Sequence, residues 1–99
     1  LTAIASVIPH TSLTALSANN NGITDKAMGA EGLTHLQELY LKYNLITDKG
    51  ALSFAQNLDD RSCRLSWICL QGNEVTKKGG QIIKLCLPET IPGGSIVDY

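Results

Sequence analysis

The chain has 99 residues, which suffices for one small domain around one hydrophobic core. Eight Lys and Arg against nine Asp and Glu give a formal net charge of −1, and this balance disfavours a nucleic-acid-binding module, because phosphate backbones attract strongly basic surfaces. Although 43% of the residues are apolar, no apolar run approaches the roughly 20 residues that cross a bilayer. The sequence therefore predicts neither nucleic-acid binding nor membrane insertion.

The three cysteines, Cys63, Cys69 and Cys86, are spaced irregularly. An odd count without a two-residue clip argues against a disulfide framework and against a zinc ribbon. We expect reduced, buried thiols, and the chain carries no N-x-Ser/Thr sequon for glycosylation. Both features favour a cytoplasmic protein.

The chain opens on residues 1–12, in which apolar side chains at helix-like spacing precede Pro9. These apolar residues are Ala3, Ile4, Val7 and Ile8. We expect this segment to be the end of a preceding helix, because proline stops a helix. Since the first residue is Leu and the chain starts within an element, we predict that the 99 residues belong to a longer protein.

Residues 13–35, 36–64 and 65–87 repeat one pattern. Each begins Leu-x-x-apolar-x-apolar-x-x-Asn-x-apolar-Thr. The repeated Asn residues are Asn21, Asn44 and Asn73, which lie 23 and 29 residues apart. Self-similarity at such a period is typical of repeat proteins, in which each unit packs against its neighbours.

Each repeat starts with a predicted short strand, because inward apolar positions alternate with outward positions there. Two inward columns run across the three repeats. They contain Leu16, Leu39 and Ile68, and Ala18, Leu41 and Leu70. Stacked repeats would place these strands side by side in a parallel sheet.

A turn with an Asn follows each predicted strand. The Asn side chains of the column can bond backbone groups of neighbouring turns, which otherwise stay unsatisfied at a cost of about 1 to 3 kcal/mol each. Their predicted role is structural. The Thr-Asp pair that comes next resembles a helix N-terminus, at which Thr47 or Asp48 can act as the cap.

Helices are expected after these turns, because apolar residues recur at helical spacing in the second and third repeats. Those residues are Ala51, Leu52, Phe54, Ala55, Leu58, Ile82, Ile83 and Leu87. The first repeat has 23 residues against 29 in the second and contains Gly29 and Gly32, so we expect an abbreviated or irregular helix there. Residues 88–99 carry two prolines and a Gly pair before Ile96 and Val97, and they are either a cap over the last hydrophobic edge or a flexible tail.

The second repeat carries a family resemblance. It contains an Ile-Thr-Asp-Lys-Gly stretch at 46–50, which is followed by a helical segment and then by Cys63, Arg64 and Leu65 before the next strand. This order resembles the ribonuclease-inhibitor-like class of leucine-rich repeats, which NOD-like receptors and the Ran GTPase-activating protein also use. The resemblance covers residues 1–87. It implies an α/β solenoid, a short horseshoe with parallel strands on the concave face and helices on the convex face. It also implies that the concave face binds other proteins.

The outward strand positions are the candidate binding site. Three of the five aromatic residues, Tyr40, Tyr43 and Trp67, fall on these positions, and aromatic anchors with a polar rim are typical of binding hot spots. The predicted rim residues are Glu38, Lys42 and Gln71. Aromatic residues on a sheet also stack across strands without any partner, and this alternative stays open.

No catalytic machinery is visible in the sequence. His10 and His35 lack metal-ligand spacing, and no nucleophile elbow, P-loop or zinc-protease motif is present. Cys69 has only Lys42 as a candidate neighbour, which favours an inert thiol. We therefore predict a protein that is not an enzyme and that needs no metal or other cofactor.

The lysines that stand two residues after the Thr of each repeat form a recurring column. Its members are Lys26, Lys49 and Lys78. Such a stripe could meet an acidic partner, but Asp25 and Asp48 lie beside it, and solvated lysines are the favoured interpretation.

The predicted function is recognition of a protein partner by the concave face. One alternative is a structural segment of a larger assembly or multidomain protein, whose ends stack on neighbouring repeats of its own chain. A less favoured alternative, suggested by the resemblance, is regulation of a GTPase, for which Arg61 and Arg64 would be the available arginines.

Overall fold

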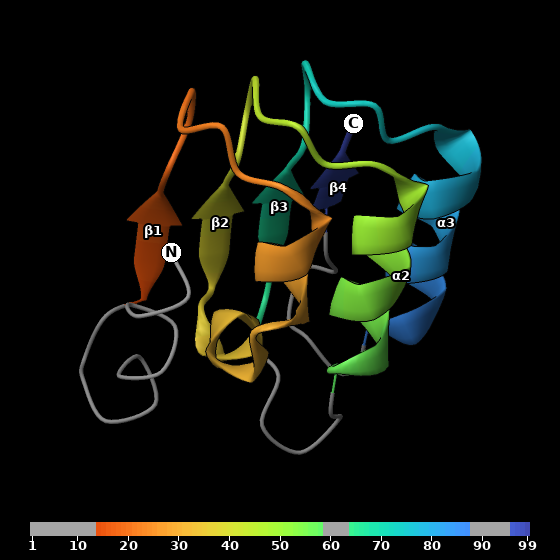
Figure 1. Cartoon of the computed structure of the whole chain (residues 1–99). Helices are drawn as coiled ribbons and strands as arrows, with labels where there is room; N and C mark the ends of the chain where they lie inside the picture. The colour runs from red at the N-terminus through yellow and green to blue at the C-terminus, as the bar shows by residue number, and fades with distance from the viewer. Residues whose placement is uncertain (1–13, 59–63, 88–95) are drawn as a thin grey trace.

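The protein is described here by a computed structural model, which describes residues 14–58, 64–87 and 96–99. Within these ranges, four short parallel strands form one sheet in the order β1-β2-β3-β4. The strands are β1 (Ala15–Ser17), β2 (Glu38–Tyr40), β3 (Trp67–Cys69) and β4 (Ile96–Asp98). Figure 1 shows them side by side, with the helices on one side of the sheet.

The helical layer changes its character along the chain. The first repeat contributes two short 3-10 helices, η2 (Asp25–Gly29) and η3 (Glu31–His35). The later repeats contribute α2 (Asp48–Gln56) and α3 (Lys77–Cys86), which lie side by side in Figure 1. The prediction of an abbreviated helix in the shorter first repeat is therefore confirmed.

The hydrophobic core lies between the sheet and the helical layer. Both inward columns of the sequence pattern contribute to it, since Leu39, Ile68 and Leu41 are fully buried. Fully buried residues that the repeat pattern did not single out include Met28 and Leu33, which come from the 3-10 helices. Both side chains therefore belong to the same core cluster as the inward columns.

One predicted core-facing residue is exposed. Leu52 shares the apolar spacing of α2, but 45% of its surface is accessible, whereas Phe54 and Ala51 are fully buried. Helical geometry explains the difference, because residues one and two positions apart point in different directions around the axis. The apolar side of α2 is thus narrower than the sequence suggests.

The end of the chain adds a strand to the sheet. In β4, Val97 pairs in register with Ile68 and packs against the core. The ring of Tyr99 lies against α3, where a Cβ added at Gly80 would collide with it. The capping role of residues 88–99 and the bounds of the repeats stay predictions. The expected helix end within residues 1–12 lies outside the described residues.

The arrangement as a whole is a parallel four-stranded sheet with helical segments that follow each of the first three strands. It fits an α/β repeat fold. Among the described residues, no helix is long and apolar enough to span a bilayer.

Candidate functional site

Three of the predicted binding residues lie on strands, at the register that the sequence columns predict. Glu38 and Tyr40 belong to β2, and they pair with Trp67 and Cys69 of β3. Because alternate strand residues point to opposite faces, all four side chains lie on the face opposite to the buried Leu39. We call the surface formed by these four residues and by Asp98 of β4, which pairs with Cys69, the outer sheet face.

The Tyr40 side chain is hydrogen-bonded to another side chain of its own strand. Its hydroxyl donates a hydrogen bond of 2.9 Å to Oε1 of Glu38. This hydrogen bond raises the pKa of Tyr40 above its ordinary value, and burial and the negative charge of Glu38 add to the increase. The phenol therefore stays protonated and holds the Glu38 carboxylate in place across the outer sheet face.

The side chain of Trp67 is partly exposed. In the register of the sheet, Trp67 pairs with Glu38 of β2 on one side and with Ile96 of β4 on the other. Its indole Nε1 is buried and has no hydrogen-bond partner among the described residues. A buried donor of this kind costs stability unless the surrounding contacts offset it. The edge of the indole that carries Nε1 therefore packs within the protein, and only part of the ring is available to a partner.

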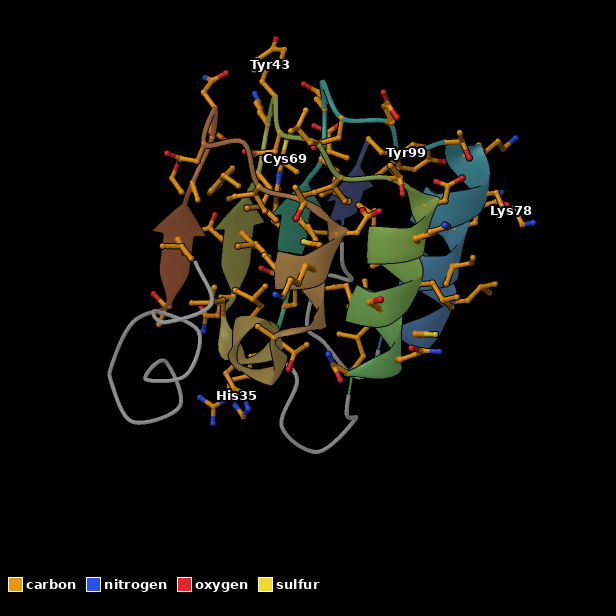
Figure 2. The ribbon with its side chains drawn as sticks, viewed as in Figure 1. His35, Tyr43, Cys69, Lys78 and Tyr99 are labelled. Carbon is orange, nitrogen blue, oxygen red and sulfur yellow. The ribbon has the colours of Figure 1, made fainter. Side chains whose placement is uncertain are left out.

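The other predicted site residues lie beyond the ends of the strands. The prediction that the outward strand positions extend through Lys42, Tyr43 and Gln71 is wrong, because β2 ends at Tyr40 and turns follow β2 and β3. The physical reason is the left-handed backbone of both turns, because neither Tyr43, with a φ of 56°, nor Gly72, with a φ of 76°, can continue a strand. Figure 2 places Tyr43 at the end of the molecule formed by these turns, opposite to His35.

Tyr43 holds a backbone conformation that suits Gly or Asn better than an aromatic residue. At the same place in the neighbouring repeats stand Asn20 and Gly72, with φ values of 60° and 76°. The Tyr43 side chain is 62% exposed, and its ring lies against the turn at Gly72, where an added Cβ would collide with it. An exposed aromatic residue that is kept in a strained conformation is a candidate for function.

Asp98 is a polar residue of the outer sheet face that the sequence analysis did not single out. It stands beside Cys69 in register; its carboxylate accepts hydrogen bonds from Gln71 Nε2 at 2.8 Å and from the Cys69 thiol at 3.7 Å. The thiol thus bonds a carboxylate, whereas the sequence offered only Lys42 as a candidate neighbour. Only alignment of Ile96, Val97 and Asp98 with the earlier strands could have identified Asp98 from the sequence.

The side chains of Asn44 and Asn73 bond backbone groups of neighbouring turns. Asn44 Oδ1 accepts bonds from the backbone N–H groups of Asn21 and Ile23 at 2.9 and 3.0 Å. Asn44 Nδ2 donates to the carbonyls of Ala18, Leu41 and Lys42. Asn73 Oδ1 accepts a bond from the backbone N–H of Ile46, and Asn73 Nδ2 donates to the carbonyls of Leu41 and Leu70. Asn21 differs, since it is exposed and its Nδ2 donates to Asn19 O within its own turn.

A second ladder links each helix start to the repeat before it. Thr47 caps α2 and accepts a bond from Lys49 N, while its own N–H and hydroxyl donate to Asp25 at 2.7 and 2.6 Å. Asp48 accepts the same pair of bonds from Thr76, at 2.8 and 2.6 Å. Asp48 therefore serves the next helix, α3, rather than capping its own.

These bonds lower the pKa of Asp48. The side chain of Thr76 contributes most and its backbone N–H next, whereas burial opposes the decrease and Lys78 and the N–H of Gly79 support it. A lowered carboxyl pKa stabilises the folded state above the ordinary carboxyl range, and this stabilisation is lost as the pH falls through the folded-state pKa.

We therefore expect Asp48→Asn to be less stable than the wild type at neutral pH, with a difference that shrinks in acid below the ordinary pKa of 3.8. Urea unfolding at a series of pH values measures this difference. The exposed Glu74, in the connection from β3 to α3, provides a control with the same change of charge, Glu74→Gln. A difference that does not depend on pH would contradict the proposed role of the carboxylate.

Other candidates for chemistry stand apart from the outer sheet face. In the described part of the chain, no group of three His, Cys, Asp or Glu residues could hold a metal ion. His35 ends η3, and Arg64 is exposed before β3, while Cys63, His10 and Arg61 lie outside the described residues. Cys69 and Cys86 are free thiols, the first buried and the second exposed. The lysines of the predicted column are exposed, as Lys78 on α3 illustrates in Figure 2.

The parallel sheet, the Asn ladder and the Asp–Thr ladder define a repeat protein in which each unit satisfies backbone groups of its neighbour. A family model described as Leucine Rich repeat matches residues 32–55, which include most of η3, all of β2 and most of α2. The match supports a leucine-rich repeat family. No curated protein matches the chain significantly. Proteins of this family generally mediate protein–protein interactions and are generally non-catalytic.

Proposed function

We propose that the protein is a non-catalytic recognition module that binds a protein partner through the outer sheet face and the turns next to it. In this proposal the repeats form a short curved solenoid of the ribonuclease-inhibitor-like class, with the outer sheet face on the concave side, in a cytoplasmic protein. Trp67, Tyr40 and Tyr43 are the aromatic anchors. The polar residues that tune specificity are Glu38, Lys42 and Gln71.

Tyr43 is the observation that carries the proposal. Its ring is 62% exposed although its backbone is left-handed, and the equivalent residues of the neighbouring repeats are Asn and Gly. A sequence selected for stability alone has a better residue for this turn. Binding of a partner explains why an aromatic side chain is kept at the end of the strands.

We expect Tyr43→Asn to weaken partner binding by about thirtyfold, as the loss of a hot spot of about 2 kcal/mol would. The free energy of unfolding should change by less than about 0.5 kcal/mol, because relief of backbone strain offsets the lost contacts of an exposed ring. Pull-down from cell extract identifies the partner, and titration of the purified pair gives the affinity.

Leu85→Gln is the matched control, since Leu85 is an exposed apolar residue on α3. The proposal requires that Leu85→Gln retains the partner and that Tyr43→Asn loses it. The reverse result would place binding on the helical side. If both variants retain the partner, the turn that contains Tyr43 is not part of the interface.

One observation favours the alternative of a repeat segment within a larger assembly. The outer side of α3 carries Leu85, which is 85% exposed, and a groove lined, among the described residues, by Gln81, Lys84, Leu85 and Leu87. Exposed apolar surface at the last helix of a stack is where a further unit would pack. Loss of assembly in Leu85→Gln, with Tyr43→Asn unaffected, would establish this second function.

A further inference from the structure

The two carboxylates of the outer sheet face flank β3. Glu38 is on β2 and pairs with Trp67, and Asp98 is on β4 and pairs with Cys69. Neighbouring strands are about 4.8 Å apart and each residue rises about 3.3 Å, so the two acidic positions, two strands and two residues apart, are separated by about 12 Å. The indole of Trp67 and the thiol of Cys69 lie between them.

Among the described residues, only neutral donors bond the two carboxylates. Glu38 accepts from the hydroxyl of Tyr40 at 2.9 Å. Asp98 accepts from Gln71 Nε2 at 2.8 Å and from the thiol of Cys69. Within residues 14–58, 64–87 and 96–99, neither acid forms an ion pair with Lys or Arg, and each carboxylate keeps acceptor positions that these bonds do not use.

This combination favours a cationic side chain from outside. A charged donor bonds a carboxylate more strongly than a neutral donor does, and the face of an aromatic ring attracts the same cation. Arginine suits both groups, because its planar guanidinium forms paired bonds to a carboxylate and stacks on aromatic rings. Lys42 sits in the turn after β2, and within the described ranges it forms no ion pair with either acid.

We propose that the outer sheet face recognises a partner segment by an arginine side chain that lies over Trp67 between Glu38 and Asp98. This inference rests on the proposed recognition function and specifies the chemistry of the partner. The partner is a protein segment with exposed arginine, and the carboxylates supply its specificity, while Tyr43 adds an apolar contact at the neighbouring turn.

Trp67 is the only tryptophan of the chain, so its indole N–H signal reports on this face alone. We would titrate the isotope-labelled full chain with the peptide acetyl-Gly-Gly-Arg-Gly-Gly-amide. The matched peptides carry Lys, Glu or the neutral arginine analogue citrulline at the centre. The expected result is a saturable shift of the Trp67 signal with Arg, a weaker response with Lys, and none with Glu or citrulline.

The variants Glu38→Gln and Asp98→Asn remove the charges but keep acceptors for Tyr40 and Gln71. Each should weaken arginine binding at least tenfold, and added salt should weaken it in the wild type. Glu74→Gln should leave it unchanged. Equal responses to Arg and citrulline, no response to Arg, or equal loss in Glu74→Gln would overturn the inference.

The partner from the pull-down separates this inference from the proposed function. Capture that requires Tyr43 but is unaffected by Glu38→Gln and Asp98→Asn would refute arginine recognition and leave partner binding intact. The opposite outcome is that the chain binds the arginine peptide but captures no protein partner in a way that depends on Tyr43. That outcome would refute the proposed function of Tyr43.

Discussion

We expect Asn44→Ala to lower the free energy of unfolding by about 3 kcal/mol, although it removes no apolar contact area of note. The reason is the number of backbone groups that depend on one side chain. Two N–H groups donate to Asn44 Oδ1, and three carbonyls accept from its Nδ2. Asn44 is 5% exposed, so water replaces few of these bonds.

Asn21→Ala is the matched control, because Asn21 holds the same place in the first repeat. Its side chain is exposed and donates a bond to Asn19 O within the same turn. We expect a change below about 0.5 kcal/mol for this variant. Asn73→Ala should fall between the two, since Asn73 is partly exposed and makes three backbone bonds.

Urea unfolding of the three variants measures these free energies, with the slope of the transition as a check that the unfolded states are comparable. The expected order of destabilisation is Asn44, Asn73, Asn21. Equal losses at all three positions would contradict the ladder, because they would mean that each Asn acts within its own turn.

The repeat pattern predicted the sheet well because strand register follows from sequence period. Leu16, Leu39 and Ile68 share one column in the sequence and pair in the structure. The same alternation placed Glu38 and Trp67 on the face opposite to the core. These predictions needed only the two-residue period of a strand and the repeat spacing.

The turns could not be predicted in the same way, because their geometry depends on backbone dihedrals that an apolar pattern does not encode. The pattern treats Tyr43 as one more outward residue, yet its φ of 56° takes it out of the sheet. The equivalent Asn20 and Gly72 carry the signal, since both residue types tolerate the left-handed region.

Contacts between repeats do not follow from the pattern of one repeat either. Asp48 stands beside Thr47 in the chain and fits a cap of its own helix, but its carboxylate bonds Thr76 of the next repeat. Gly79 makes this possible, because an added Cβ there would collide with the Asp48 carboxylate. The Asp of one repeat and the Gly of the next therefore have to be considered together.

The second large effect on stability is expected for a substitution in the turn of the third repeat. We expect Gly72→Ala to lower the free energy of unfolding by about 2 kcal/mol, whereas Gly22→Ala should lower it by about 1 kcal/mol. Both glycines are left-handed, with φ values of 76° and 64°. A Cβ at Gly22 has no atom within 4 Å, but a Cβ at Gly72 meets the ring of Tyr43.

The difference between these two variants isolates the contact of the ring, because the cost of the left-handed backbone is common to both. In a Tyr43→Asn background this difference should vanish, which urea unfolding of the double variants would reveal. Partner affinity gives an independent measurement: Gly72→Ala should reduce it by displacing the Tyr43 ring, and Gly22→Ala should not. If Gly72→Ala destabilises the fold but leaves the affinity unchanged, the position of the Tyr43 ring does not matter for recognition, and the binding site lies elsewhere on the protein.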